Sequence, residues 1–102
     1  MKEIMEVAGY IRKELRRAED YAYEANKHKH QYPDMAQSYA KAAQEHLNTA
    51  DMLHMGATKM IDNAKKMDSE PTEDMKKVWG YEHEMMVEEK ATIMRMLDVY
   101  KT

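Results

Sequence analysis

The residues of this chain that could do chemistry are histidines and carboxylates, because the sequence contains no cysteine. That absence excludes disulfides, thiolate metal sites and cysteine nucleophiles, and it leaves His, Asp and Glu as the strong metal ligands. Several of them fall in phase with apolar stripes, namely Glu14, Glu19, His46, Glu82 and Glu89. A charged group in a buried stripe costs free energy unless it is paired or binds a cation. These positions predict a polar layer inside a helical protein.

Three helices would have to position this layer. The two prolines stand beside acidic residues, in Tyr32-Pro33-Asp34 and in Glu70-Pro71-Thr72-Glu73, which is typical of a first helical turn. Elsewhere apolar residues recur with a helical period and without the alternation of strands. We expect one all-α domain over residues 1–102, with three long antiparallel helices at about 2–29, 34–67 and 72–100 in an up-down-up bundle.

Folding the two hairpins predicts which polar residues meet. A turn near residue 31 brings Glu14 or Glu19 towards Glu45 and His46. A turn near residue 70 brings the third helix over the second and places imidazoles within about one helical turn of each other. The predicted metal ligands are Glu14, Glu19, Glu45, His46, His54, Glu82 and His83, around Fe, Mn or Zn. The alternative for each single residue is a boundary position that is hydrogen-bonded to a neighbour.

The stretch from Tyr39 to His54, preceded by Glu14-Leu-Arg-Arg-Ala-Glu19-Asp-Tyr21, resembles the first helical hairpin of ferritin-like and rubrerythrin-like proteins. The similarity covers about residues 10–64, and the third helix is similar only loosely. More narrowly, the chain is similar to the short ferritin-like proteins of bacteria and their phages, most of which have no assigned function. The resemblance implies a hairpin in which one helix supplies a Glu and the next a Glu-x-x-His to a di-iron centre.

The metal motif of this chain departs from that pattern. Glu14 or Glu19 matches the first Glu, but Glu45-x-x-Asn48 has Asn in place of His. The pair Asp51-x-x-His54 keeps the spacing two turns later, and a fourth helix with a second motif is lacking. The resemblance therefore implies an altered metal site, or one completed by several subunits. Whether the chain is an enzyme is left open.

Charge and hydropathy bear on the partners and the compartment. With 19 acidic and 16 basic residues, the chain lacks the positive field that duplex nucleic acid requires. It has neither an apolar run of about 18 to 20 residues nor the apolar core of a secretory signal at its start. We expect no nucleic-acid partner, no membrane association and a cytoplasmic location.

Twelve methionines, no phenylalanine and many alanines describe a slender core with adaptable packing. Three long helices of this kind leave an apolar flank uncovered, so we expect a homo-oligomer or a protein partner. The rival function to metal binding is a non-catalytic structural or adaptor bundle. In such a bundle, the acidic residues that fall in phase with the apolar stripes pair with Lys and Arg, and the Met-rich flank binds a protein.

Each expected helix contains one interior glycine, at Gly9, Gly56 or Gly80. Such a glycine costs about 1 kcal/mol relative to alanine. The hairpin register places all three towards one end of the rod. A close approach of two helices or a small cavity at that end would explain them.

Overall fold

The computed structural model describes residues 2–66 and 73–102. Within these ranges the chain forms three α-helices and no strand, namely α1 (Lys2–His28), α2 (Pro33–Lys66) and α3 (Glu73–Lys101). The prediction of an all-helical chain is confirmed. Where the structure describes the helix ends, they lie within one residue of the expected ones. The ends expected at residues 67 and 72 lie outside the described residues.

The junction between α1 and α2 follows from local chemistry. Lys27 and His28 lie in the last turn of α1, where their positive charge suits the negative end of the helix dipole. The Tyr32 N–H donates to the His28 carbonyl at 2.8 Å. Pro33 then begins α2, where its missing N–H costs nothing, and Asp34 follows in the first turn. A short connection therefore suffices to return the chain along α1.

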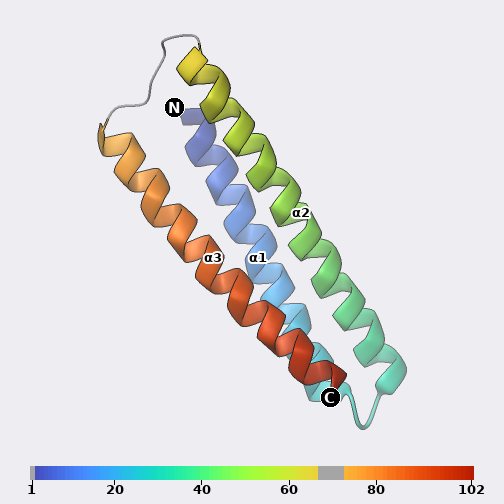
Figure 1. Cartoon of the computed structure of the whole chain (residues 1–102). Coiled ribbons are helices and arrows are strands. Elements are labelled where there is room, and N and C mark those ends of the chain that lie inside the picture. Colours follow the sequence, from blue (N-terminus) through green and yellow to red (C-terminus); the bar gives the residue numbers. More distant parts are fainter. Residues whose placement is uncertain (1, 67–72) are drawn as a thin grey trace.

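Helix α1 lies at the centre of the packing. Both α2 and α3 pack along it, whereas α2 and α3 make few contacts with each other among the described residues. The molecule is a rod of 56 by 18 by 17 Å (Figure 1). The buried side chains of α1 recur at helical spacing and are Ile4, Ala8, Ile11, Leu15, Ala18, Ala22 and Ala25. Their partners include Leu47 on α2 and Ile93 on α3, both almost fully buried.

Side-chain contacts fix how the helices are aligned. Between α1 and α2 the pairs descend along α2, from Glu14 with His46 to Tyr21 with Tyr39. Between α1 and α3 the partners ascend together, and the hydrogen bond from Asn26 to the Met96 carbonyl joins residues that are 70 apart in sequence. In Figure 1 the C-terminal ends of α1 and α3 lie at one end of the rod. The start of α1 and the end of α2 lie at the other.

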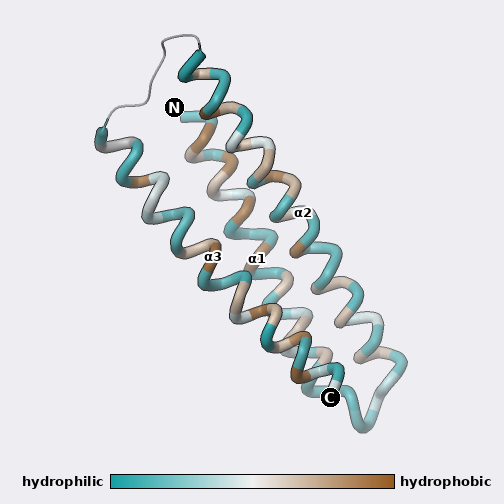
Figure 2. The backbone as a smooth tube through the Cα atoms, in the orientation of Figure 1, coloured by the Kyte–Doolittle hydropathy of each residue, from teal (hydrophilic) through white to brown (hydrophobic). Residues whose placement is uncertain are grey.

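Apolar and polar stretches alternate along each helix (Figure 2), as expected for helices with one buried and one exposed side. In the part of the chain that the structure describes, no polar or charged side chain is fully buried. Of the polar residues predicted to interrupt the core, Glu14, His46, Glu82 and Glu89 lie at its boundary, where water reduces the cost of their charge, and Glu19 is exposed. None of the helices, over their described residues, combines the length and apolar character needed to cross a bilayer.

The expected explanation for the glycines is wrong. A Cβ added at Gly56 or Gly80 would meet no atom within 4 Å, and one at Gly9 would meet only the Arg12 side chain at 3.9 Å. Contacts at 4 Å are ordinary and no neighbouring backbone approaches these positions. Neither close helix packing nor a filled cavity requires a glycine here.

Candidate functional site

Helix α1 presents one polar stripe to α2. Glu14, Tyr21 and His28 are spaced by seven residues, which keeps them on one side of the helix. Glu14 contacts His46, while the rings of Tyr21 and His28 each stack on Tyr39 with centroids 6.0 Å apart. A ladder of aromatic and titratable side chains therefore runs along the α1–α2 interface.

A second stripe faces α3. Arg12, Glu19 and Asn26 are also spaced by seven residues, and each meets a residue of α3 that lies 70 positions later. Arg12 forms an ion pair with Glu82, and Glu19 lies against Glu89. The constant offset means that α1 and α3 keep one register over at least two heptads. Glu14 and Glu19 differ by five residues, or about 140° around the helix, so they serve different interfaces.

The Glu14–His46 pair is the closest contact between a predicted carboxylate and a predicted imidazole. His46 Nδ1 bonds to Glu14 Oε2, and the Tyr21 ring stacks on the imidazole at 5.4 Å. The side chains retain 26% and 19% of their exposure, so the pair is shielded yet reachable by water. A carboxylate on Nδ1 orients an imidazole and leaves Nε2 as the ligating or proton-accepting atom. Among the described residues Nε2 has no hydrogen-bond partner.

The acids of the α1–α3 interface have contrasting partners. Glu82, only 13% exposed, is neutralised by Arg12. Glu89 faces Glu19 instead, and its pKa is raised by burial first and by the negative charge of Glu19 second, with Arg16 acting in the opposite direction. Two carboxyl groups that share a site favour protonation of one of them. Protonated Glu89 can then donate a hydrogen bond to Glu19.

The third meeting point joins α2 and α3. The imidazoles of His54 and His83 lie with centroids 5.0 Å apart and planes tilted by 37°, and the Trp79 ring lies 6.2 Å from His54. Burial lowers the pKa of His54, His83 lowers it further, and Asp51 opposes both. His54 is therefore neutral at pH 7. One turn away, Lys90 Nζ donates to Asp51 at 2.8 Å.

These residues border a groove between α2 and α3, with α1 as its floor. A cleft of about 130 Å³ lies in it. Its apolar lining comes from all three helices, and the polar lining residues are the two imidazoles and the Asp51–Lys90 ion pair. The lining residues are Ile11, Leu15, Ala50, Asp51, His54, His83, Met86, Val87 and Lys90. The groove exists because α2 and α3 pack on different sides of α1 and scarcely touch each other.

The predicted ligands fall in separate places. Glu14 and His46 meet between α1 and α2, Glu19 and Glu82 lie between α1 and α3, His54 and His83 meet between α2 and α3, and Glu45 is exposed. Within residues 2–66 and 73–102, no three His or carboxylate side chains gather where an ion could bind. The metal centre stays a prediction, and so does its identity as Fe, Mn or Zn.

Three partners were missed by the sequence reasoning, namely Arg12 for Glu82, Lys90 for Asp51 and Glu89 for Glu19. A signal for two of them was present. The residues Arg12 and Glu19 repeat the seven-residue spacing of Glu82 and Glu89. Matching these two series would have suggested the register between α1 and α3.

Comparisons with protein-family models, with curated proteins and with solved structures found no match to this chain. The resemblance to ferritin-like proteins therefore remains a prediction from the sequence.

Proposed function

We propose that this chain is a non-catalytic helical interaction module that self-associates through the groove between α2 and α3. The proposal includes an up-down-up bundle of the ferritin-like kind, in which α2 and α3 flank α1 and the fourth corner is open. The observation that carries it is that α2 and α3 both pack on α1 yet scarcely contact each other. A four-helix bundle would place one more helical layer over that corner.

The composition of the groove suits a helical partner. Its floor, Ile11 and Leu15, is apolar, and its wall includes Val87, which remains 54% exposed. Met55 lies one turn beyond Asp51, and Met94 one turn beyond Lys90, so both flank the groove, with 61% and 50% of their surface exposed. Large exposed apolar side chains that border an apolar cleft favour association with protein. Methionine adapts its shape to such a partner.

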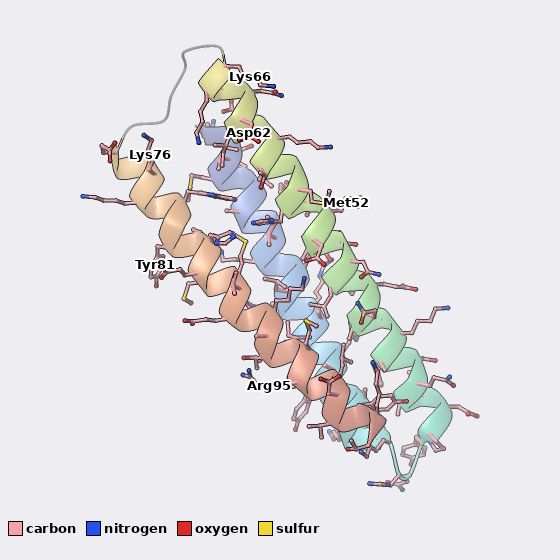
Figure 3. All side chains as sticks on the ribbon, viewed as in Figure 1. Met52, Asp62, Lys66, Lys76, Tyr81 and Arg95 are labelled. Atoms are coloured by element: carbon pink, nitrogen blue, oxygen red, sulfur yellow. The ribbon has the colours of Figure 1, made fainter. Side chains whose placement is uncertain are left out.

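Charge favours a second copy of the chain as the occupant. Asp51 and Lys90 already pair with each other. Three turns beyond Asp51 on the same side of α2 lies Asp62, and α3 carries Lys76 two heptads before Lys90. Asp62 and Lys76 lie towards the same end of the rod (Figure 3). A copy rotated by half a turn about the long axis would set its α3 over this α2. Lys76 of the copy would then face Asp62 of this chain, and Asp62 of the copy would face Lys76, which is the self-complementarity of a twofold interface.

Light scattering of purified protein at tens of micromolar tests this proposal. The wild-type chain is expected to have the mass of a dimer, and Val87→Lys should shift it to the monomer by placing a charge in the apolar contact. Val99→Lys is the matched control, because Val99 is 58% exposed on the same helix and does not line the groove. A monomeric wild type, or equal effects of both variants, would refute the proposal.

Binding of Fe, Mn or Zn is the second candidate function, and the Glu14–His46 contact favours it. The carboxylate on Nδ1 presents Nε2 of His46 as a metal ligand would be presented. Thermal shifts with Fe(II), Mn(II) and Zn(II) test this role on protein without a polyhistidine tag. A ligand at a hundredfold excess over its Kd should stabilise the chain by about 2.7 kcal/mol. A shift that is absent, or that is unchanged in His46→Gln, would exclude this site.

A further inference from the structure

The α2–α3 groove contains a pair of imidazoles with an arrangement that self-association does not require. We propose that His54 and His83 form a two-imidazole site for a late first-row transition-metal ion, namely Cu²⁺, Ni²⁺ or Zn²⁺. The site would use one ligand from each of two helices, and in the monomer water in the groove would supply the remaining ligands. It is distinct from the Glu14–His46 pair and does not depend on dimerisation.

The geometry of the pair carries the proposal. Two ring nitrogens that bind one tetrahedral ion, each about 2.0 Å from it, lie about 3.3 Å apart. The rings of His54 and His83 already lie 5.0 Å apart, centroid to centroid, and are tilted by 37° instead of being stacked flat. Small rotations of the two side chains can therefore point a nitrogen of each ring at a common centre. Because α2 and α3 both pack on α1, their backbones hold the two residues in this relation.

The nitrogens of this pair are also free to bind. His28 bonds to Glu24, and His46 to Glu14. Among the side chains that the structure describes, none forms a hydrogen bond to the ring of His54 or of His83. Two imidazoles without hydrogen-bond partners among the described side chains form a nitrogen ligand set.

The surroundings select the kind of ion. The cleft beside the rings is lined by Ile11, Met86 and Val87, and the nearby Asp51 carboxylate is neutralised by Lys90. A site with nitrogen donors and a neutralised carboxylate disfavours Mg²⁺, Ca²⁺ and Mn²⁺, which prefer oxygen ligands. Imidazole suits Zn²⁺, Ni²⁺ and Cu²⁺. With Asp51 paired to Lys90, the two imidazoles supply the ligands of this site.

Trp79 offers a direct probe, because it is the single tryptophan of the chain and its ring lies 6.2 Å from His54 and 6.5 Å from His83. We would titrate the metal-free, untagged chain with Cu²⁺ and Ni²⁺ and follow Trp79 fluorescence. Paramagnetic ions bound at this distance should quench it saturably. Calorimetry with Zn²⁺, which does not rely on the indole, measures the same site independently.

The variants His54→Gln and His83→Gln should each weaken binding by about tenfold or more, since losing even an outer partner of a metal ligand costs 10- to 100-fold. His46→Gln is the control and should bind as the wild type does. Circular dichroism establishes that each variant is folded. Equal affinity in all four proteins, or a loss confined to His46→Gln, would overturn the proposal. The second of these results would instead assign binding to the Glu14–His46 pair.

Discussion

The attachment of α3 to α1 depends on a small number of buried side chains, and Ile93 is the best single test of it. Ile93 is 0% exposed and lies in the core cluster with Leu15 and Ala22 of α1. The substitution Ile93→Ala removes three carbon atoms. At about 0.8 kcal/mol for each buried carbon, the transfer term is about 2.4 kcal/mol. The cavity left behind adds to it, and measured losses for this kind of change run from about 2 to 5 kcal/mol.

We therefore expect Ile93→Ala to lower the free energy of unfolding by about 3 kcal/mol. That is a large share of the roughly 5 to 15 kcal/mol of a typical domain. At about 4 to 8 °C for each kcal/mol in a chain of this size, the melting temperature should fall by more than 10 °C. Val99→Ala is the control on the same helix, where 58% exposure predicts a change of about 0.5 kcal/mol or less.

Urea unfolding at one fixed protein concentration measures both variants, with circular dichroism for all helices and Trp79 fluorescence for α3. The two probes are informative together, because detachment of α3 alone would move the tryptophan signal first. A loss below about 1 kcal/mol for Ile93→Ala, or one no larger than that of Val99→Ala, would refute the packing of α3 on α1 described above.

Three further perturbations have defined signs. In urea titrations, the free energy of unfolding of Glu89→Gln should increase relative to that of the wild type as pH rises from 4 to 7. The pKa of Glu89 is raised in the folded chain, so the protonated carboxyl stabilises the fold fully at pH values below the pKa of the unfolded chain. That stabilisation is lost as pH rises through the pKa of the folded chain, and the variant does not lose it. His54→Gln, studied without metal, should lose less stability than the wild type as pH falls below about 6.5. The pKa of His54 is lowered in the folded chain, so the neutral imidazole stabilises the fold at pH values above the pKa of the unfolded chain. That stabilisation is lost as pH falls through the pKa of the folded chain. A pH profile parallel to that of the wild type would contradict either expectation. Gly80→Ala should raise the melting temperature by stabilising α3 by about 0.5 to 1 kcal/mol, since an added Cβ meets nothing within 4 Å. A lower melting temperature would point to an unseen contact.

The helices could be predicted from the sequence because their signals are local. Proline with acidic neighbours begins α2 at Pro33, and apolar spacing marks the buried side of α1 from Ile4 to Ala25. Val7, which lies in the same apolar stripe, is half-buried. Such patterns depend on neighbours within a few turns, so one sequence contains them in full.

The polar layer could be predicted only in part. The helical phase shows which residues lie near the buried side of a helix, and hairpin folding shows their height along the bundle. Neither shows which neighbouring helix a residue faces. Either Glu14 or Glu19 was expected to approach Glu45 and His46, and Glu14 contacts His46. Glu19 was placed in the same layer, but its direction around α1 carries it to α3 and Glu89. The side of α1 on which α3 packs depends on how all three helices pack together. Folding the two hairpins separately does not determine it.

The interaction groove is tested most directly by a spin label at Val87, because the chain has no native cysteine to interfere. A Val87→Cys protein carries one label per chain, so any dipolar coupling between labels must arise from two copies. The account predicts a defined distance between labels at position 87, shorter than the distance measured with Val99→Cys. Absence of coupling at tens of micromolar, or a shorter distance at position 99, would contradict self-association through the α2–α3 groove.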